Sequence, residues 1–322
     1  MTRFLLILLG GLLTLISCDN LSDKSSDKQD LIIFHAGSLT VPFKEITSEF
    51  QKVYPDINIV MEGAGSRKCA RKITDLHKEC DIMASADYTV IDKLLIPEYA
   101  SWNIKFASNE MTIAYHKDSR LAESINSKNW YEILLNDEVA FGRSDPNSDP
   151  CGYRSVLTAK LAEIYYSEEG LAKKLLSKDI NYIRPKETDL LGLLESNSID
   201  YIFLYRSVAE QHGLSFVVLP DSINLKLPDY TRFYEQATIE ITGKKPGEFI
   251  TKKGEPMVYG ITIPNNAPNK DAAMKFMNYL LTNDKGLAIM RRNGQPDLVP
   301  SPSESYNNVP LELREFVLPV SE

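Results

Sequence analysis

The sequence predicts an α/β fold with two lobes, and three observations support this prediction. Short apolar runs alternate with helical patterns, beginning with the run at residues 31–36 and the helical pattern at 41–54. This alternation is typical of a doubly wound, mostly parallel sheet. It starts again after residue 137, which predicts a second sheet. Two further strand-like runs, at residues 110–116 and 256–264, flank the second series and can link the two lobes.

The tail of the chain indicates how the lobes are connected. Residues 271–295 have the pattern of two helices, which we expect to return to the first lobe. The first lobe is therefore expected to contain residues 31–112 and 262–322, and the second lobe residues 113–261. With 322 residues, of which 43% are hydrophobic, the chain can form two cores. In sheets of this kind, ligands bind where loops follow the carboxyl ends of the strands.

The N-terminal residues predict export. Arg3 precedes an apolar stretch at residues 4–16, which is shorter than a typical membrane-spanning helix. The stretch ends in Leu-Ile-Ser-Cys, which resembles the bacterial lipoprotein signal and predicts lipidation of Cys18. We expect a signal peptide at 1–17, a polar tether at 18–30, and a lipid-anchored protein facing the periplasm or the cell exterior. An ordinary secretory signal or an uncleaved anchor is the alternative.

Charge and cysteine content exclude other classes of protein. The net charge is −8 and the isoelectric point is about 5.2, which argues against non-specific nucleic-acid binding. Beyond Cys18 the chain has three cysteines, an odd number that cannot pair completely within the chain. A predicted helix over residues 66–79 would hold Cys69 and Cys80 roughly 16 Å apart, too far for a disulfide. We expect free, buried thiols, and the spacing, including Cys151, fits no zinc motif.

Small residues and hydroxyls recur where a predicted strand meets a helix. Gly37 and Ser38 form the first such junction, Ser66 the second, and Asp149 precedes a helix at the third. Backbone N–H groups at a helix start lack partners, and the helix dipole makes that end positive, so several such junctions can form an anion cradle. Simple helix capping is the alternative at each junction. Four basic residues can steer anions or form a solvated helix face: Arg67, Lys68, Arg71 and Lys72.

Several of these segments resemble one family when taken in order. The segments HAGSLTVPF, GAGS, ASADY, NWYEIL, RSDPNSDPCGYRS, LYRSVAEQHGL and VYGITIP are similar to those of the archaeal-type tungstate/molybdate-binding proteins of ABC transporters. The resemblance runs from about residue 31 to about residue 299. It implies a two-lobed, type II periplasmic-binding-protein fold with the ligand between the lobes. It also implies a monomer that delivers an oxyanion to permease subunits, without a cofactor and without enzymatic activity.

The same resemblance implies a set of ligand-binding residues. Cys151 would act mainly through its backbone N–H, and Glu187 would supply a second carboxylate, with Asp189 as the alternative for that role. The complete implied set is Gly37, Ser38, Ser66, Asp149, Pro150, Cys151, Glu187 and Tyr205.

Two acids beside an anion require a chemical reason, because like charges repel. Tungsten(VI) and molybdenum(VI) can accept further oxygen ligands, so Asp149 and Glu187 would bind the metal centre directly, which the sulfur of sulfate does not permit. Two alternatives remain open at this stage. One is a binding protein for another anion, such as sulfate or phosphate. The other is an enzyme with Cys151 as nucleophile, for which the candidate bases are His35, His77, His116 and His212.

Overall fold

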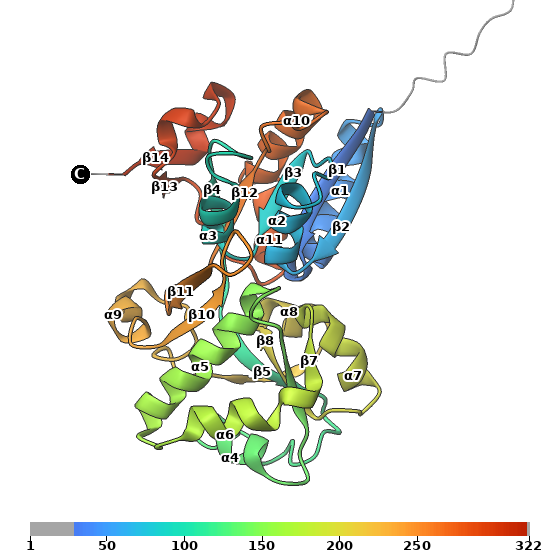
Figure 1. The fold of residues 1–322 in the computed structure, drawn as a ribbon. Helices are drawn as coiled ribbons and strands as arrows, with labels where there is room; N and C mark the ends of the chain where they lie inside the picture. The colour runs from blue at the N-terminus through green and yellow to red at the C-terminus, as the bar shows by residue number, and fades with distance from the viewer. Residues whose placement is uncertain (1–28, 321–322) are drawn as a thin grey trace, which may run out of the picture.

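The computed structural model describes residues 29–320 and shows two α/β lobes stacked along the long axis of the molecule (Figure 1). Each lobe is built on a five-stranded sheet, which confirms the predicted fold class. The predicted signal peptide, Cys18 and most of the predicted tether lie outside the described residues. Within residues 29–320, no helix has the length and apolar character needed to cross a bilayer.

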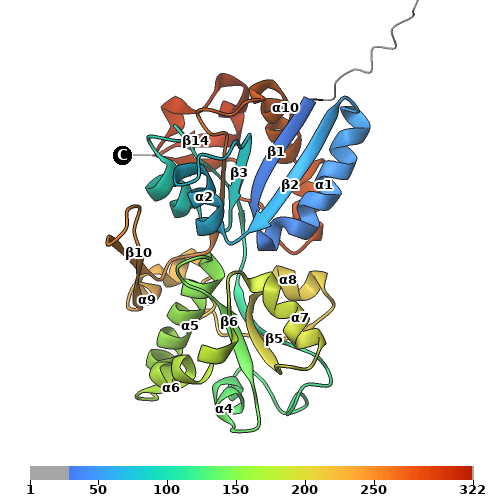
Figure 2. The same ribbon diagram turned by 45° about the vertical axis from the view of Figure 1, so that its right-hand side comes forward.

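The first sheet has the strand order β2-β1-β3-β12-β4, and Figure 2 shows β2, β1 and β3 side by side in this order. Strands β1, β2 and β3 run parallel, whereas β12 runs antiparallel to both β3 and β4. The late strand β12 therefore completes the sheet with which the described chain begins. The strands are β1 (Gln29–Ala36), β2 (Ile57–Ala64), β3 (Ile82–Ser85), β4 (Ile104–Ser108) and β12 (Val258–Thr262).

The second sheet has the order β7-β6-β8-β5-β9. Strand β6 is parallel to β7 and β8, but β5 is antiparallel to β8 and β9. The sheet is thus mostly parallel, as predicted, with β5 alone running against the other four strands, because the chain enters β5 directly from the other lobe and not through a helical crossover. The strands are β5 (Met111–Tyr115), β6 (Phe141–Ser144), β7 (Ile183–Arg184), β8 (Tyr201–Tyr205) and β9 (Ser215–Val218).

Helices α1 (Thr40–Val53), α10 (Lys270–Leu281) and α11 (Gly286–Arg292) pack together in the first lobe. Phe43 and Phe50, one helical repeat of seven apart, are fully buried on α1. The Phe276 ring of α10 lies edge-on to both, with centroid distances of 6.1 and 5.3 Å. The two tail helices therefore return to the first lobe, as the sequence pattern predicts.

Helix α5 (Pro150–Tyr166) is the central helix of the second lobe. Pro150 occupies the first turn, where its missing N–H costs no hydrogen bond. The helix is buried along most of its length because β6, α6 and the β10–β11 hairpin all contact it. The other helices of this lobe are α4 (Trp130–Leu135), α6 (Leu171–Lys178), α7 (Leu191–Glu195), α8 (Arg206–Gln211) and α9 (Thr231–Tyr234).

A hairpin of β10 (Thr238–Thr242) and β11 (Phe249–Lys253) lies beside the junction of the two lobes (Figure 1). It contacts the first lobe through Arg71 on helix α2 (Ser66–Thr74), whose Nη2 donates to Thr242 Oγ1 at 2.9 Å. Lys160 on α5 donates to its other end, at Thr238 O. The hairpin therefore connects the lobes outside the two chain crossings. Smaller elements are α3 (Tyr88–Val90), β13 (Ser301–Ser303) and β14 (Val317–Pro319).

The helix predicted over residues 66–79 is shorter in the structure. Helix α2 spans Ser66–Thr74, and His77 adopts a left-handed conformation with φ of 49° beyond its end. Cys80 follows this turn and lies in the same apolar cluster as Cys69. The distance argument from one continuous helix was therefore wrong. The expected outcome holds, because Cys69, Cys80 and Cys151 are free and buried.

Candidate functional site

The register of the first sheet brings two of the predicted junctions together. Ala36 at the end of β1 pairs with Ala64 at the end of β2, so both strands end at the same edge. Ser38 and Ser66 follow directly, each within the first turn of a helix. In the second lobe, β6 leads to Asp149 and the start of α5. Three of the predicted junctions therefore face the boundary between the lobes.

The lobes touch at these junctions, and two glycines permit the contact. The Lys68 N–H donates to Ser148 O across the boundary at 3.3 Å. A Cβ atom on Gly65 would lie 2.4 Å from that same carbonyl oxygen. A Cβ atom on Gly37 would lie 2.9 Å from Glu187 Oε1. Only glycine allows the backbones and the carboxylate to approach this closely.

Asp149 and Glu187 are buried next to each other, and each is only 1% exposed. Asp149 Oδ2 accepts a hydrogen bond from the Glu187 backbone N–H at 3.0 Å. Among residues 29–320, neither oxygen of Glu187 has a hydrogen-bond partner, nor does Asp149 Oδ1. Neither side chain caps the helix that it begins or precedes. Helix capping therefore accounts for neither acid.

Burial and mutual repulsion make it unfavourable for both acids of this pair to be ionised. Burial raises the pKa of Glu187 well above its usual value, and the negative charge of Asp149 raises it further. Burial also raises the pKa of Asp149, although the hydrogen bond from the Glu187 backbone N–H opposes the shift. No described cationic side chain hydrogen-bonds to either acid. Such a pair can share a proton or bind a centre of positive charge.

Three buried hydroxyl groups lie at the same boundary, those of Ser38, Ser66 and Tyr205. Each accepts a hydrogen bond from another group of the protein. The donors are Tyr259 OH at 3.0 Å from Ser38 Oγ, the Ala86 N–H at 2.9 Å from Ser66 Oγ, and Arg154 Nη1 at 3.0 Å from Tyr205 OH.

The position of the Cys151 thiol does not favour nucleophilic chemistry. The residue lies in the first turn of α5, is fully buried, and its Sγ faces Phe203 O at 3.8 Å. Burial raises the pKa of its thiol well above the usual value, and the charge of Asp149 raises it further. His35 is engaged elsewhere, with Nδ1 2.8 Å from Ala36 O, and burial lowers its pKa.

The alternative second carboxylate, Asp189, lies away from the pair. It is exposed, and its Oδ1 lies 3.5 Å from Lys186 Nζ in a surface ion pair. The structure therefore brings Glu187, and not Asp189, next to Asp149. Both residues belong to the same 3-10 helix, Glu187–Leu190, in which successive side chains point in different directions.

The basic residues of α2 have structural partners. Arg67 Nε donates to Asn147 O at 3.1 Å, and its guanidinium also donates to Thr242 O. Arg71 donates to Gly243 O at 3.1 Å, in addition to its bond with Thr242. Lys72 pairs with Glu62, and Lys68 is exposed. Arg67 and Arg71 therefore hold the hairpin through neutral acceptors, which leave their charges in place, so the steering of anions stays a prediction.

Sequence reasoning missed the residues that support the site. Arg154 follows the predicted Cys151 by three positions, and Tyr259 lies within a segment used only for the family resemblance. Both contact predicted hydroxyls. Nothing in the local pattern identifies them, because each reaches its partner from a different strand or helix.

An open cavity of about 370 Å³ lies beside the chain crossing between β4 and β5. Its lining includes Glu110, Arg206 and Lys226, and its cations are already paired. Arg206 Nη1 and Lys226 Nζ lie 3.0 and 3.2 Å from Glu110 Oε1. The unpaired carboxylate oxygens of Asp149 and Glu187 do not line this cavity and lie between the lobes.

Two α/β lobes with buried acids and hydroxyl groups at their boundary define a two-lobed binding protein for a small solute. Residues 31–295 match the family model described as bacterial extracellular solute-binding protein, and the chain belongs to this family. Solved structures share the fold. The periplasmic molybdate-binding protein of Azotobacter vinelandii superposes with a TM-score of 0.60 at 15% identity, covering 84% of this chain and 99% of that one. The sulfate-binding protein SubI of Mycobacterium tuberculosis gives 0.60 at 13% identity, covering 90% and 92%.

Relatives with higher identity span most of the chain. An uncharacterised solute-binding protein of Petrotoga mobilis is 52% identical over 289 residues, covering 89% of this chain and 90% of that protein. The molybdate/tungstate-binding protein WtpA of Pyrococcus abyssi is 44% identical, covering 89% of each chain. WtpA of Thermococcus kodakarensis is 41% identical, covering 94% of this chain and 91% of its own.

Proposed function

We propose that this protein captures tungstate or molybdate and delivers it to an ABC transporter. The observation that supports this best is the pair of buried acids, Asp149 and Glu187, which have no cationic hydrogen-bond partner among residues 29–320 and lie at the same lobe boundary as the hydroxyls of Ser38 and Tyr205. The acids would bind the metal centre while uncharged donors bind the oxygens. The names of the WtpA relatives support the same ligand class.

The chemistry of the ligand explains why both kinds of group are needed. Tungsten(VI) and molybdenum(VI) are large, hard centres that accept carboxylate oxygens as additional ligands. Coordination would replace the unfavourable contact between two buried charges with two bonds to a positive centre. Sulfate offers no such centre, so the same acids would repel it. The oxyanion is the cargo of the protein, and the proposal requires no cofactor and no catalytic step.

A titration series with four anions tests this function. We expect molybdate and tungstate to bind with sub-micromolar dissociation constants, corresponding to about −8 kcal/mol or better. Sulfate and phosphate should bind at least about a hundredfold more weakly, since each lacks the metal-centred bonds. Isothermal titration calorimetry at neutral pH measures all four constants. Competition by sulfate within about tenfold would favour the alternative, a protein for another small anion.

The proposal extends to where the protein acts. Membership of an extracellular solute-binding family supports export, and we infer that lipidation of Cys18 anchors the protein to the cell membrane. Cys18→Ser should then move the protein from the membrane fraction to the soluble fraction. We also infer a monomer that docks on permease subunits, so light scattering should give the mass of one chain.

A further inference from the structure

The three hydroxyl groups of the candidate site make hydrogen bonds in the same direction. Ser38, Ser66 and Tyr205 each accept a hydrogen bond from the protein, and among residues 29–320 none of them donates one. A buried hydroxyl proton without an acceptor is unfavourable. All three protons are therefore available to an acceptor that enters between the lobes.

The polarity at Ser38 can be traced back to Asn109, at the crossing between β4 and β5. Asn109 Oδ1 accepts from the backbone N–H groups of Glu110 at 3.0 Å and Ser207 at 3.4 Å. Backbone N–H groups can only donate, so this side of the amide is the oxygen. Asn109 Nδ2 must then face the opposite way, where Tyr259 OH lies at 2.9 Å and Ser207 Oγ at 2.7 Å.

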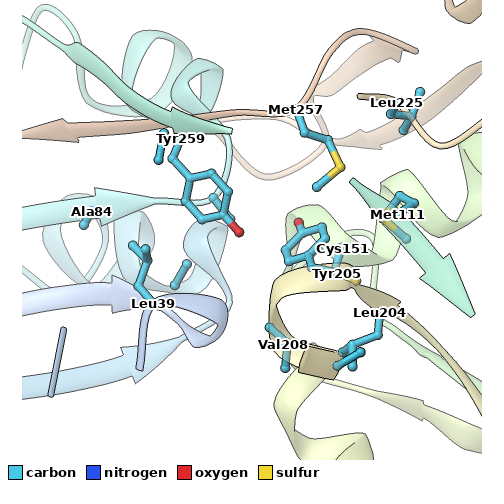
Figure 3. Close-up of a cluster of buried hydrophobic side chains, with 14 of the residues drawn as sticks. Leu39, Ala84, Met111, Cys151, Leu204, Tyr205, Val208, Leu225, Met257 and Tyr259 are labelled. Atoms are coloured by element: carbon cyan, nitrogen blue, oxygen red, sulfur yellow. The ribbon is translucent and has the colours of Figure 1, made fainter. Parts of the chain in front are cut away.

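The orientation of the Asn109 amide fixes the direction of the hydrogen bonds at Tyr259 and Ser38. The Tyr259 oxygen accepts from Asn109, and its own proton is donated to Ser38 Oγ at 3.0 Å. Burial raises the pKa of Tyr259, so the phenol keeps this proton. Tyr259 and Tyr205 extend toward each other from the two lobes, with ring centroids 6.3 Å apart (Figure 3). Both phenols therefore lie where the lobes meet.

Arg154 imposes the same polarity on Tyr205. Its guanidinium has no acceptor atom, so the bond from Nη1 to Tyr205 OH has one possible direction. Nη1 also donates to Ala86 O at 2.6 Å, on the residue whose N–H donates to Ser66. Two of the hydroxyls are thus supported by one buried side chain.

We propose that Asn109 and Tyr259 are positioning residues, which orient the Ser38 hydroxyl as a donor to the bound oxyanion through the relay Asn109→Tyr259→Ser38. This inference rests on the proposed function, because it needs an anion between the lobes. Asn109 also holds Ser207 at the start of α8 in the second lobe. The relay consequently connects the crossing between β4 and β5, both lobes and the Ser38 hydroxyl.

A double-mutant cycle tests whether Tyr259 acts through Ser38. Ser38→Ala should raise the molybdate dissociation constant about 10- to 100-fold, because it removes a hydrogen bond to a charged ligand. Tyr259→Phe should raise it about tenfold. The double variant should bind no more weakly than Ser38→Ala, within about threefold. If the two effects multiply instead, Tyr259 acts independently of Ser38 and the relay is wrong.

A reversal of polarity gives a second readout that a purely structural role would not produce. Asn109→Asp keeps the shape but removes the donor, so Tyr259 would donate to the aspartate and accept from Ser38. Molybdate binding should weaken about tenfold or more in the wild-type background and much less in the Ser38→Ala background. An equal loss in both backgrounds would show a general effect of the added charge and would overturn the relay.

A matched control is Tyr234→Phe, which removes another buried phenol. Tyr234 OH donates to Asp221 O, away from the lobe boundary, so molybdate binding should not change. Melting temperatures of all variants identify any that fail to fold. Wild-type titration separates the two claims. If sulfate binds in place of molybdate, the proposed function fails, and the same cycle measured with sulfate still tests the relay.

Discussion

At the scale of single residues, Asp149 and Glu187 are expected to favour ligand binding but to lower the stability of the unliganded protein. Removing a carboxylate from water costs several kcal/mol unless a partner compensates it. Among the described residues, no cationic side chain hydrogen-bonds to either acid. The pair is therefore a local weakness of the unliganded protein that a bound metal centre can relieve.

Removing both carboxylates should affect affinity and selectivity together. We expect Asp149→Ala combined with Glu187→Ala to weaken tungstate binding at least about a hundredfold, since two metal-centred bonds are lost. Sulfate should bind as well as before or better, because the repulsion is gone. Calorimetric titration with both anions measures the ratio. Asp189→Ala, at the exposed neighbour, is the control. An unchanged ratio in the double variant would contradict a role of the acids in selectivity.

The raised pKa of Glu187 predicts how stability depends on pH. Its usual value is 4.5, and the folded protein binds this proton more tightly than the unfolded chain. Between pH 4.5 and the raised folded pKa, the unfolded chain releases the proton first, so stability falls as pH increases. Without ligand, Glu187→Gln should melt at a higher temperature than the wild type at pH 8, with a smaller difference at pH 5.

Thermal melts across this pH range, with Asp189→Asn as control, check the prediction. Asp189→Asn changes a neighbouring exposed carboxylate and keeps both buried acids, so it is the matched control. A melting difference between Glu187→Gln and wild type that is constant with pH would contradict a titrating Glu187.

At the scale of elements, the β10–β11 hairpin adds a buried ion pair between the lobes. Lys252 Nζ of β11 lies 2.7 Å from Asp87 Oδ2, just after β3, and 2.6 Å from Thr89 Oγ1. The Tyr153 hydroxyl of α5 donates to the same carboxylate. Burial opposes the charged form, but Lys252 and Arg154 lower the pKa of Asp87. The carboxylate therefore joins three segments that are distant in sequence.

Removing one partner of this ion pair should lower the free energy of unfolding more than removing both charges. Lys252→Met leaves Asp87 charged and buried, which should lower the free energy of unfolding by about 3–5 kcal/mol. Adding Asp87→Asn should recover part of this loss, because no unpaired charge remains. Urea denaturation measures both variants. Lys244→Met, which removes a surface pair with Glu98 at 2.9 Å, should cost at most about 1 kcal/mol. Equal losses in the buried and surface variants would refute the argument.

At the scale of the whole molecule, the predicted donors come from both lobes, so ligand binding should favour the closed arrangement. The chain crosses between the sheets at residues 108–111 and again before β12. Because so few chain crossings join the lobes, the lobes can move relative to each other. With saturating tungstate, the radius of gyration from small-angle X-ray scattering should decrease. An unchanged radius would argue against closure.

A single methyl group at the lobe boundary should hinder that closure. A Cβ atom on Gly65 would lie 2.4 Å from the Ser148 carbonyl oxygen of the other lobe, and backbone atoms cannot easily move aside. Gly65→Ala should therefore weaken tungstate binding about tenfold or more and reduce the change in radius. Gly192→Ala has open space around its Cβ and should bind as the wild type. Normal affinity in Gly65→Ala would contradict a tight lobe contact in the bound state.

The sequence by itself determined the two-lobed architecture and the junction residues. Strand and helix periodicity is local, and so are the glycine and hydroxyl residues at the end of a strand. This is why Gly37, Ser38 and Ser66 could be identified along the chain. The family resemblance added Glu187 and Tyr205, whose local patterns indicated only a cap and a strand end.

Only the tertiary structure decided what surrounds those residues. Tyr259 reaches Ser38 from 221 positions away, and Lys252 reaches Asp87 from 165. The end of α2 at Thr74 and the engagement of Arg71 by the hairpin also lie beyond local pattern. Periodicity reports which face of an element is buried. It does not report which distant donor fills the remaining hydrogen bond, because that depends on how the sheets and the hairpin pack.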